Sequence, residues 1–395
     1  MLTTKEYSEN FAQWCADCVR ITDKITGQAV PFILNAPQRR VAALMEAKRK
    51  AGQPIRIIML KARQWGGSTL TQIYMAWMQL TRHKGWNSLI CSHVKDASAN
   101  IRGMYSQLLR NYPEELRGAA DSTKAWSFSP YEKSANTGYI PARDCRVAVT
   151  SAYAPDAVRG ASFQMAHLSE VAFWGDGDPA AAERIVRTVG GSVPLAEDTV
   201  VVMESTADGT ENYFYTEWQR AVKGESDKIP VFVPWYEIEI YRLHLSDKEK
   251  TEWPGKFDEY ELMLLHKLSL DVEQVAWYHT KRKEYTNHED MMAEYPTTAD
   301  EAFSRPRQPF LSPDEISMVK TGEPTDARDI LRLILLPAER HDNCVAAILK
   351  QTAEGEYMLD VTRDAPRRDT MADAAADKKI PSLILLPAKA DLSAD

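Results

Sequence analysis

The sequence predicts an α/β protein with a mainly parallel sheet. Strand-like runs rich in β-branched residues alternate with helix-like runs through its first half, a pattern typical of consecutive βα units. One strand-to-helix junction, in "IRIIMLKARQWGGSTLTQIYMAW", carries two adjacent glycines. A length of 395 residues, with 44% hydrophobic and 26% charged residues, indicates globular material divided into more than one domain.

The alternation defines the elements of this α/β region. The predicted strands are 55–60, 88–92, 146–151, 164–168 and 199–204, and helical patterns among them cover 68–80 and 97–109. Four segments follow from the changes in pattern. They are a helical, polar segment at 1–50, the α/β region at 51–238, a charged and aromatic helical segment at 239–305, and a region of strand-like runs after a proline-rich junction at 306–395.

The charge balance excludes some classes of partner. With 48 basic and 56 acidic residues the net charge is −8, which argues against coating nucleic acid with the whole surface but allows a local basic patch. No run approaches the length of a membrane span, and the N-terminus "MLTTKEYSEN" lacks the pattern of a signal peptide. We expect a cytosolic protein without a membrane partner.

The glycine-bearing junction predicts a rearranged phosphate loop. If Gly66-Gly67-Ser68 is aligned with the G-K-[ST] of such a loop, Gly67 stands at the lysine position and Lys61 at that of the first glycine. Glycine lets backbone N–H groups at a helix N-terminus point at phosphates. Lys61 and Arg63 are near enough to supply the cation, and Ser68 stands where a hydroxyl binds Mg²⁺. A Gly-Gly turn after a strand is weak evidence by itself.

Two later strands end in polar residues that fit the same chemistry. The run 163–168 leads into Ser169-Glu170, where Glu170 would polarise an attacking water and Ser169 would reach Mg²⁺ through water. The strand in "TVVVMESTADGTENYF" ends near Ser205 and Thr206, whose hydroxyls would sense the γ-phosphate at the edge where α/β ligands bind. The alternatives are an acidic cap on a strand end and ordinary turn residues.

Together these motifs resemble the large terminase subunits that package viral DNA into procapsids. The resemblance rests on "NAPQRR", "KARQWGGST", "MAHLSEVAFW" and "MESTADGTENYF", and covers roughly residues 25–235. It implies a P-loop NTPase at 51–238, with Glu170 as the catalytic carboxylate, Ser205 and Thr206 coupling hydrolysis to movement, and Arg159 stabilising the transition-state charge. It also implies that ATP and Mg²⁺ are held by Gln38 at the adenine and by Lys61, Arg63, Gly66, Gly67, Ser68 and Thr69 at the phosphates and metal.

The resemblance implies a role and partners as well. The expected activity is an ATP-driven translocase for double-stranded DNA that acts as a homo-oligomeric ring in the host cytoplasm, with a small terminase subunit and the portal of the procapsid. Two alternatives stay open, a catalytically weak nucleotide- or DNA-binding assembly factor and a superfamily 2 helicase-like ATPase. Gly67 and Ser169 depart from the commoner pattern of the family and motivate the first alternative.

Large terminases usually add a C-terminal nuclease of RNase H type, and 306–395 predicts a partial or degenerate version of it. Strand-like runs at 330–336, 344–350, 356–361 and 382–386 fit the outline, but Leu336 falls at the first metal-binding position, where an oxygen donor is needed. Asp342 is placed like the second aspartate, and the sequence ends at Asp395, earlier than a full nuclease would. A metal site of Asp342, Asp360 and Asp364 in another register remains the alternative.

Overall fold

The computed structural model describes most of residues 2–304 and five short strands beyond them. The described ranges are 2–23, 26–93, 97–117, 125–131, 134–152, 162–175, 179–304, 319–320, 330–337, 344–351, 357–365 and 383–385, with the backbone alone at 97–102, 134–136, 179 and from 319 onward. The chain forms two compact units, Met1–Pro306 and Arg307–Asp395.

The first unit is built on an eight-stranded sheet in the order β10-β3-β9-β8-β4-β7-β6-β5. Strands β10 to β7 in this order are parallel, and β6 and β5 add an antiparallel edge. The mainly parallel sheet is therefore confirmed. The strands are β3 (Ile55–Lys61), β4 (Asn87–Ser92), β5 (Ser129–Tyr131), β6 (Ser134–Ile140), β7 (Cys145–Ser151), β8 (Met165–Ser169), β9 (Val200–Ser205) and β10 (Ile229–Val233).

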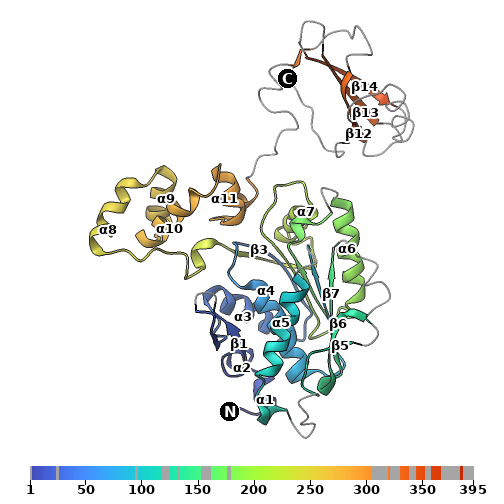
Figure 1. The fold of residues 1–395 in the computed structure, drawn as a ribbon, viewed down its shortest axis with the longest axis vertical. Helices are drawn as coiled ribbons and strands as arrows, with labels where there is room; N and C mark the ends of the chain where they lie inside the picture. The colour runs from blue at the N-terminus through green and yellow to red at the C-terminus, as the bar shows by residue number, and fades with distance from the viewer. Residues whose placement is uncertain are drawn as a thin grey trace. The chain divides into compact units, whose positions relative to one another are not determined.

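Helices cover both faces of this sheet (Figure 1). The alternation of side chains along a strand explains why: in β9, Val200 and Val202 lie in one apolar core, whereas Val201 and Met203 lie in the other. The first core receives α3 (Ala36–Lys50), α4 (Gly67–Trp77) and α5 (Ala97–Arg110), and the second receives α6 (Pro179–Ser192) and α7 (Tyr213–Val222). A π-helical turn, Met78–Arg82, extends α4.

The sequence predicted a helical N-terminal segment, and the structure shows that the segment also contains strands. Between α2 (Phe11–Cys18) and α3, an antiparallel hairpin joins β1 (Arg20–Thr22) to β2 (Ala29–Pro31). The short α1 (Thr4–Tyr7) precedes them. Three-residue strands carry too little periodicity to be recognised in a sequence.

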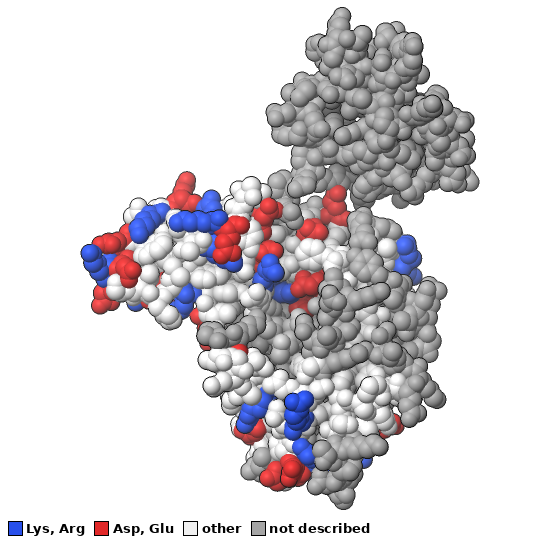
Figure 2. All heavy atoms as spheres, viewed as in Figure 1, with Lys and Arg blue, Asp and Glu red and all other residues white. Residues whose placement is uncertain are grey.

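Residues after β10 form the predicted run of helices. These are α8 (Asp247–Glu252), α9 (Glu259–Lys267), α10 (Val272–Arg282), α11 (His288–Glu294) and α12 (Ala299–Ala302). Trp277 of α10 stacks on Trp235 and Tyr241, two core residues that precede these helices in the sequence, and so packs the helices against the first core. On the face seen in Figure 2, Lys and Arg alternate with Asp and Glu over these helices. None of the described helices is long and apolar enough to cross a membrane.

The second unit contains a five-stranded sheet in the order β11-β14-β13-β12-β15. Its strands are β11 (Val319–Lys320), β12 (Ile330–Pro337), β13 (Cys344–Gln351), β14 (Tyr357–Ala365) and β15 (Leu383–Leu385). The strands β12, β13 and β14 form an antiparallel meander, and β15 lies parallel to β12. The hexapeptide LILLPA begins at Leu333 and again at Leu383, and the first three residues of the two copies pair in parallel, Leu333 opposite Leu383 to Leu335 opposite Leu385.

Candidate functional site

Three of the predicted motifs meet at one edge of the first sheet. Strand β9 lies between β3 and β8, and all three are parallel. Lys61, Ser169 and Ser205 are their last residues. The carboxyl ends of these strands therefore bring together segments that are far apart in the sequence, at the edge where α/β proteins bind ligands.

The loop between β3 and α4 has the backbone of an anion-binding turn. Gly66 adopts a left-handed conformation with φ 84° and caps the helix, a conformation that glycine adopts without steric cost. The first helical hydrogen bond of α4 runs from the Leu70 N–H to the Gly66 carbonyl at 2.9 Å. The amides of the first turn, at Gly67, Ser68 and Thr69, thus have no intrahelical acceptor and lie at the positive end of the helix dipole.

The structure gives a steric reason for glycine at position 67. A Cβ atom placed on Gly67 would lie 2.2 to 2.6 Å from the indole ring of Trp65. Trp65 is almost fully buried in the first core, so its ring has little room to move. A lysine at the usual position of a phosphate loop is therefore incompatible with Trp65 in this place.

Gln38 contacts this loop directly. Its side-chain amide donates to the carbonyls of Trp65 at 3.4 Å and Gly66 at 3.2 Å, and Asn35 donates to the Trp65 carbonyl at 3.2 Å. Asn35 and Gln38 also form the capping box that begins α3. The predicted adenine contact and the phosphate loop are thus neighbours, and the role of Gln38 toward adenine stays a prediction.

Lys61 supplies the buried cation of the site. Its ammonium lies 2.6 Å from Glu170 Oε1 and 3.8 Å from Glu204 Oε2. Burial alone would lower the pKa of Lys61, but these two carboxylates raise it above its usual value. Lys61 is therefore charged at neutral pH and is held between two carboxylates from neighbouring strands.

Glu204 is a member of the site to which the sequence assigned no role. It is 1% exposed, and its Oε1 accepts hydrogen bonds from the hydroxyls of Ser68 and of Ser169, the latter at 3.1 Å. His167 Nε2 lies 3.1 Å from the same oxygen. Burial alone would raise the pKa of Glu204, but Lys61 and His167 hold it well below its usual range, so Glu204 is ionised.

Sequence reasoning passed over Glu204 because it lies inside a strand with apolar neighbours. The signal that could have found it is an acidic residue in the run "VVVME", since a fully buried strand seldom holds a carboxylate unless the carboxylate is paired.

Glu170 occupies a conformation that non-glycine residues seldom adopt. Its φ is 59°, in the left-handed region, which costs about 1 kcal/mol or more for a residue with a Cβ. Its side chain remains 35% exposed. The hydroxyl of Ser205 donates to Glu170 Oε2 at 3.5 Å and accepts from the Ala172 N–H at 3.1 Å. Ser205 therefore links the end of β9 to the candidate catalytic carboxylate, and Thr206 follows it, buried.

Arg63 is not part of this ionic group in the structure. Its guanidinium binds both oxygens of Glu294 at 3.0 Å, and its backbone N–H donates to the Glu294 carbonyl at 3.0 Å. Tyr241 donates to the Arg63 carbonyl. The residue predicted to hold phosphates thus ties the loop to α11 of the helical segment.

Two predicted site residues, Arg159 and Asp342, lie outside the described residues. In the second unit Leu336 stands opposite Val345 in the pairing of β12 with β13, and Asp360 stands opposite Ile348 in β13 with β14.

The residues around the Glu204 carboxylate fit a divalent cation bound together with a nucleotide. Among the described residues no group of three or more His, Cys, Asp or Glu side chains could hold a metal ion by itself, so the phosphates would have to supply ligands. The fit rests on Ser68, Ser169 and Glu204: two hydroxyls share Oε1, while Glu204 Oε2 has no hydrogen-bond partner within the described ranges. Oxygen donors of this kind suit Mg²⁺.

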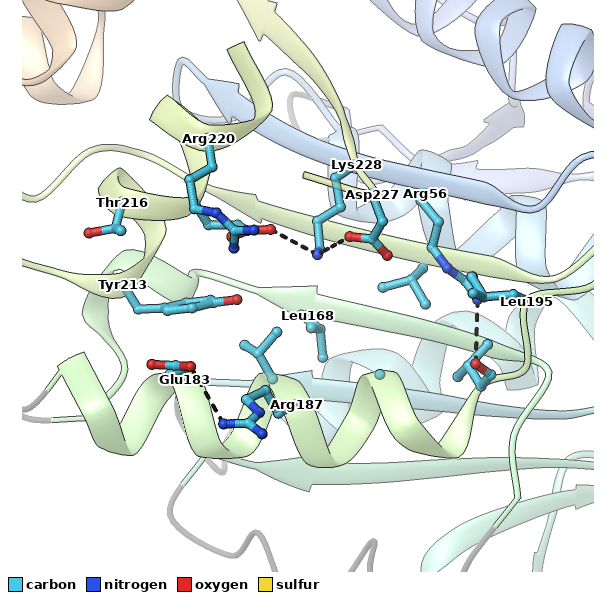
Figure 3. Close-up of a pocket in the computed structure, with 15 residues that line it drawn as sticks. Arg56, Leu168, Glu183, Arg187, Leu195, Tyr213, Thr216, Arg220, Asp227 and Lys228 are labelled. Atoms are coloured by element: carbon cyan, nitrogen blue, oxygen red, sulfur yellow. Dashed lines mark hydrogen bonds and ion pairs between the residues drawn. The ribbon is translucent and has the colours of Figure 1, made fainter. Parts of the chain in front are cut away.

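A separate pocket of about 600 Å³ lies between the sheet, α6 and α7 (Figure 3). None of the predicted site residues lines it. Most of its charged side chains pair with one another: Glu217 binds Arg220 and Lys228, and Glu183 binds Arg187. Arg56, by contrast, donates to the backbone carbonyls of Val193 and Pro194.

No family model and no curated protein matches this chain. Its structure is similar to those of several phage large terminases, the family that the motifs resemble. That of bacteriophage HK97 is 14% identical, with a TM-score of 0.49 over 98% of this chain and 74% of the other. The ATPase domain of the Thermus phage P74-26 large terminase is 16% identical, with a TM-score of 0.36 over 61% and 86%.

A third similar structure, the large terminase of a thermophilic bacteriophage in complex with ADP, is 11% identical, with a TM-score of 0.35 over 89% of this chain and 77% of that one. These TM-scores are below 0.5 and the identities below 25%, so the residues of the site itself carry the functional interpretation.

Proposed function

We propose that this chain is the large subunit of a phage terminase and that its first unit hydrolyses ATP at the carboxyl ends of β3, β8 and β9. The observation that carries the proposal is the contact of Lys61 with Glu170 beside a glycine loop that opens α4. A cation, a carboxylate and a set of free helix amides at one sheet edge are the groups that phosphoryl transfer needs.

The chemistry assigns a role to each group. The amides of Gly67, Ser68 and Thr69 would bind phosphate oxygens, and the Lys61 ammonium would neutralise the charge of the transferred phosphoryl group. The Glu170 carboxylate would accept a proton from water as the water oxygen attacks the γ-phosphorus and the bond to ADP breaks. Glu170 must then leave Lys61, which the phosphates would engage in its place.

Mg²⁺, when bound, would neutralise charge on the β- and γ-phosphate oxygens. On the protein, the Ser68 hydroxyl is the candidate ligand, and Ser169 is the candidate contact through water. Ser205 and Thr206 would couple a movement of Glu170 to a movement of β9, because the Ser205 hydroxyl contacts both Glu170 and the backbone that follows it.

The motor role extends this proposal to partners. The chain would drive double-stranded DNA into a procapsid as a ring of identical subunits, in the host cytoplasm, together with a small terminase subunit and a portal. Arg159 is the candidate for the arginine that completes a neighbouring site. The mixed charge over α8–α11 on the face seen in Figure 2 argues against DNA contact through a wholly basic surface there.

The test is ATP turnover by the purified full-length chain, with and without duplex DNA. A packaging motor should hydrolyse ATP faster with duplex DNA present. Nucleotide binding without turnover under either condition would favour an assembly factor, and absence of both binding and turnover would refute the proposal. Strand separation by the chain would indicate a helicase instead.

A further inference from the structure

The site lacks a carboxylate where phosphate-loop enzymes ordinarily carry one. In such enzymes a strand-end aspartate joins the serine or threonine of the loop in holding Mg²⁺. Here β8 ends in Ser169, directly before Glu170. A hydroxyl is a weaker partner for a divalent cation than a carboxylate, because it carries no charge.

Glu204 lies close enough to supply the carboxylate that Ser169 does not. It comes from β9, the strand beside β8, and the two strands pair Ser169 directly with Glu204. Its Oε1 accepts from the Ser68 hydroxyl, the candidate metal ligand on the loop, and from the Ser169 hydroxyl at 3.1 Å. One carboxylate oxygen therefore joins the two hydroxyls that flank the expected position of the cation.

We propose that Glu204 provides the carboxylate of the Mg²⁺ site, acting from β9 through the hydroxyls of Ser68 and Ser169. This inference rests on the proposed function, since it concerns the metal that accompanies the nucleotide. Glu204 is a positioning residue in this assignment: it orients the hydroxyls and supplies the negative charge that Ser169 does not.

A comparison with another buried glutamate separates this role from a structural one. Glu217 is 3% exposed, and both of its oxygens are occupied: Ser226 and Lys228 bind Oε1 at 2.7 and 3.1 Å, and Arg220 binds Oε2 at 2.9 Å. Glu204 is buried more deeply, yet its Oε2 has no hydrogen-bond partner among the described residues.

Burial of a carboxylate is costly in free energy, and partners must offset that cost. The structural need for Glu204 is weaker than that for Glu217, because Lys61 has a much closer partner in Glu170, at 2.6 Å against 3.8 Å. A carboxylate oxygen left without a hydrogen bond in a deeply buried position is better explained by a ligand than by packing.

The experiment measures how much Mg²⁺ improves nucleotide binding. Binding of a fluorescent ADP analogue to the full chain is titrated in Mg²⁺ and in EDTA, and Mn²⁺ binding in the presence of ADP is followed by electron paramagnetic resonance. Glu204→Gln should bind the analogue in EDTA as the wild type does. The increase in analogue affinity that Mg²⁺ causes, and the affinity for Mn²⁺, should each be about 10- to 100-fold smaller than in the wild type. Glu217→Gln is the matched control and should keep the gain.

A second variant returns the charge to β8. Ser169→Asp combined with Glu204→Gln should restore the metal-dependent gain, and it decides the question if Glu204→Gln alone does not fold. The inference is overturned if folded Glu204→Gln keeps the full gain, if it loses binding equally in Mg²⁺ and EDTA, or if the folded double variant does not recover. Failure of the wild type to bind the analogue in either buffer would instead refute the proposed function.

Discussion

The Lys61 ammonium at the end of β3 binds Oε1 of Glu170, the residue after β8, at 2.6 Å, although β9 lies between the two strands. The same lysine lies 3.8 Å from Glu204, so a single cation links the two carboxylates of the site. In the structure, the group proposed to bind phosphate therefore holds the group proposed to activate water. Binding of a triphosphate would draw Lys61 away from Glu170, and Glu170 could then accept a proton from the attacking water.

Removal of Lys61 should weaken nucleotide binding. In Lys61→Ala the loop amides remain but the buried cation is lost, so ATP affinity should fall by about tenfold or more, as expected for a charge-assisted contact of about 1.5–3 kcal/mol. Lys228→Ala is the matched control, because Lys228 is also shielded from solvent and pairs with two carboxylates. Titration of both variants with a fluorescent ATP analogue checks this; equal affinities would mean that the loop is structural.

Lys61 should also stabilise the fold over a defined pH range. Lys61→Met removes the ammonium beside the buried Glu204 carboxylate and should cost about 3–5 kcal/mol at pH 7. The folded pKa of Glu204 is depressed below its ordinary value of 4.5, so its stabilising contribution is present above pH 4.5 and is lost as the pH falls toward the folded pKa.

The folded pKa of Lys61 is raised above 10.5, so its own contribution is present below pH 10.5 and is lost at higher pH. The difference in unfolding free energy between wild type and Lys61→Met should therefore be largest from about pH 5 to 10 and shrink below about pH 4.5. Urea denaturation at a series of pH values measures it. A difference that does not change on acidification would show that the Lys61–Glu204 pair does not stabilise the fold.

Gly67 should tolerate no side chain while Trp65 keeps its place. Gly67→Ala places a methyl group 2.2 to 2.6 Å from atoms of the Trp65 ring. This steric overlap should destabilise the protein by about 1–3 kcal/mol. Gly190→Ala is the control, because Gly190 also lies in a helix and a Cβ there meets no atom within 4 Å; it should be neutral or stabilising. Thermal unfolding compares the two, and equal melting temperatures would refute the steric explanation for the absent lysine.

The sequence predicted β3, β4, β7, β8 and β9, because these are apolar runs of ordinary length between helices of clear periodicity, but it did not predict β5, β6 and β10 at the two edges of the sheet. It also placed Lys61, Ser169 and Ser205 at strand ends and Glu170 directly after one, and parallel strands bring their carboxyl ends together. The roles of these residues remain predictions.

Contacts that depend on tertiary packing could not be predicted from the sequence. The pairing of Arg63 with Glu294 joins residues 231 positions apart, and the collision that excludes a side chain at Gly67 depends on the rotamer of Trp65. Glu204 was overlooked for a related reason: whether a strand carboxylate faces a core or a site depends on its neighbours in the sheet, which only the strand order reveals.

The second unit should not cut DNA. Two-metal cleavage needs several carboxylates around ions about 4 Å apart. Leu336, which the resemblance puts at the first metal position, is an apolar residue that pairs with Val345, one pair before the end of the β12–β13 ladder. We expect the full chain to show no Mn²⁺-dependent nicking of plasmid DNA on agarose gels. Cleavage by the wild type that disappears in Asp342→Ala would show instead that carboxylates form a metal site in another register.

ATP turnover by Glu170→Gln tests the central claim most directly. The substitution removes the carboxylate that accepts the proton but keeps the loop amides and Lys61, so steady-state hydrolysis should fall by about 100-fold or more while ATP affinity stays within a few fold of the wild type. Glu237→Gln is the matched control, because Glu237 is 31% exposed, close to the 35% of Glu170, and pairs with Arg40 at 2.7 Å; it should turn over ATP like the wild type. Hydrolysis by Glu170→Gln at the rate of the wild type would contradict the assignment of this site.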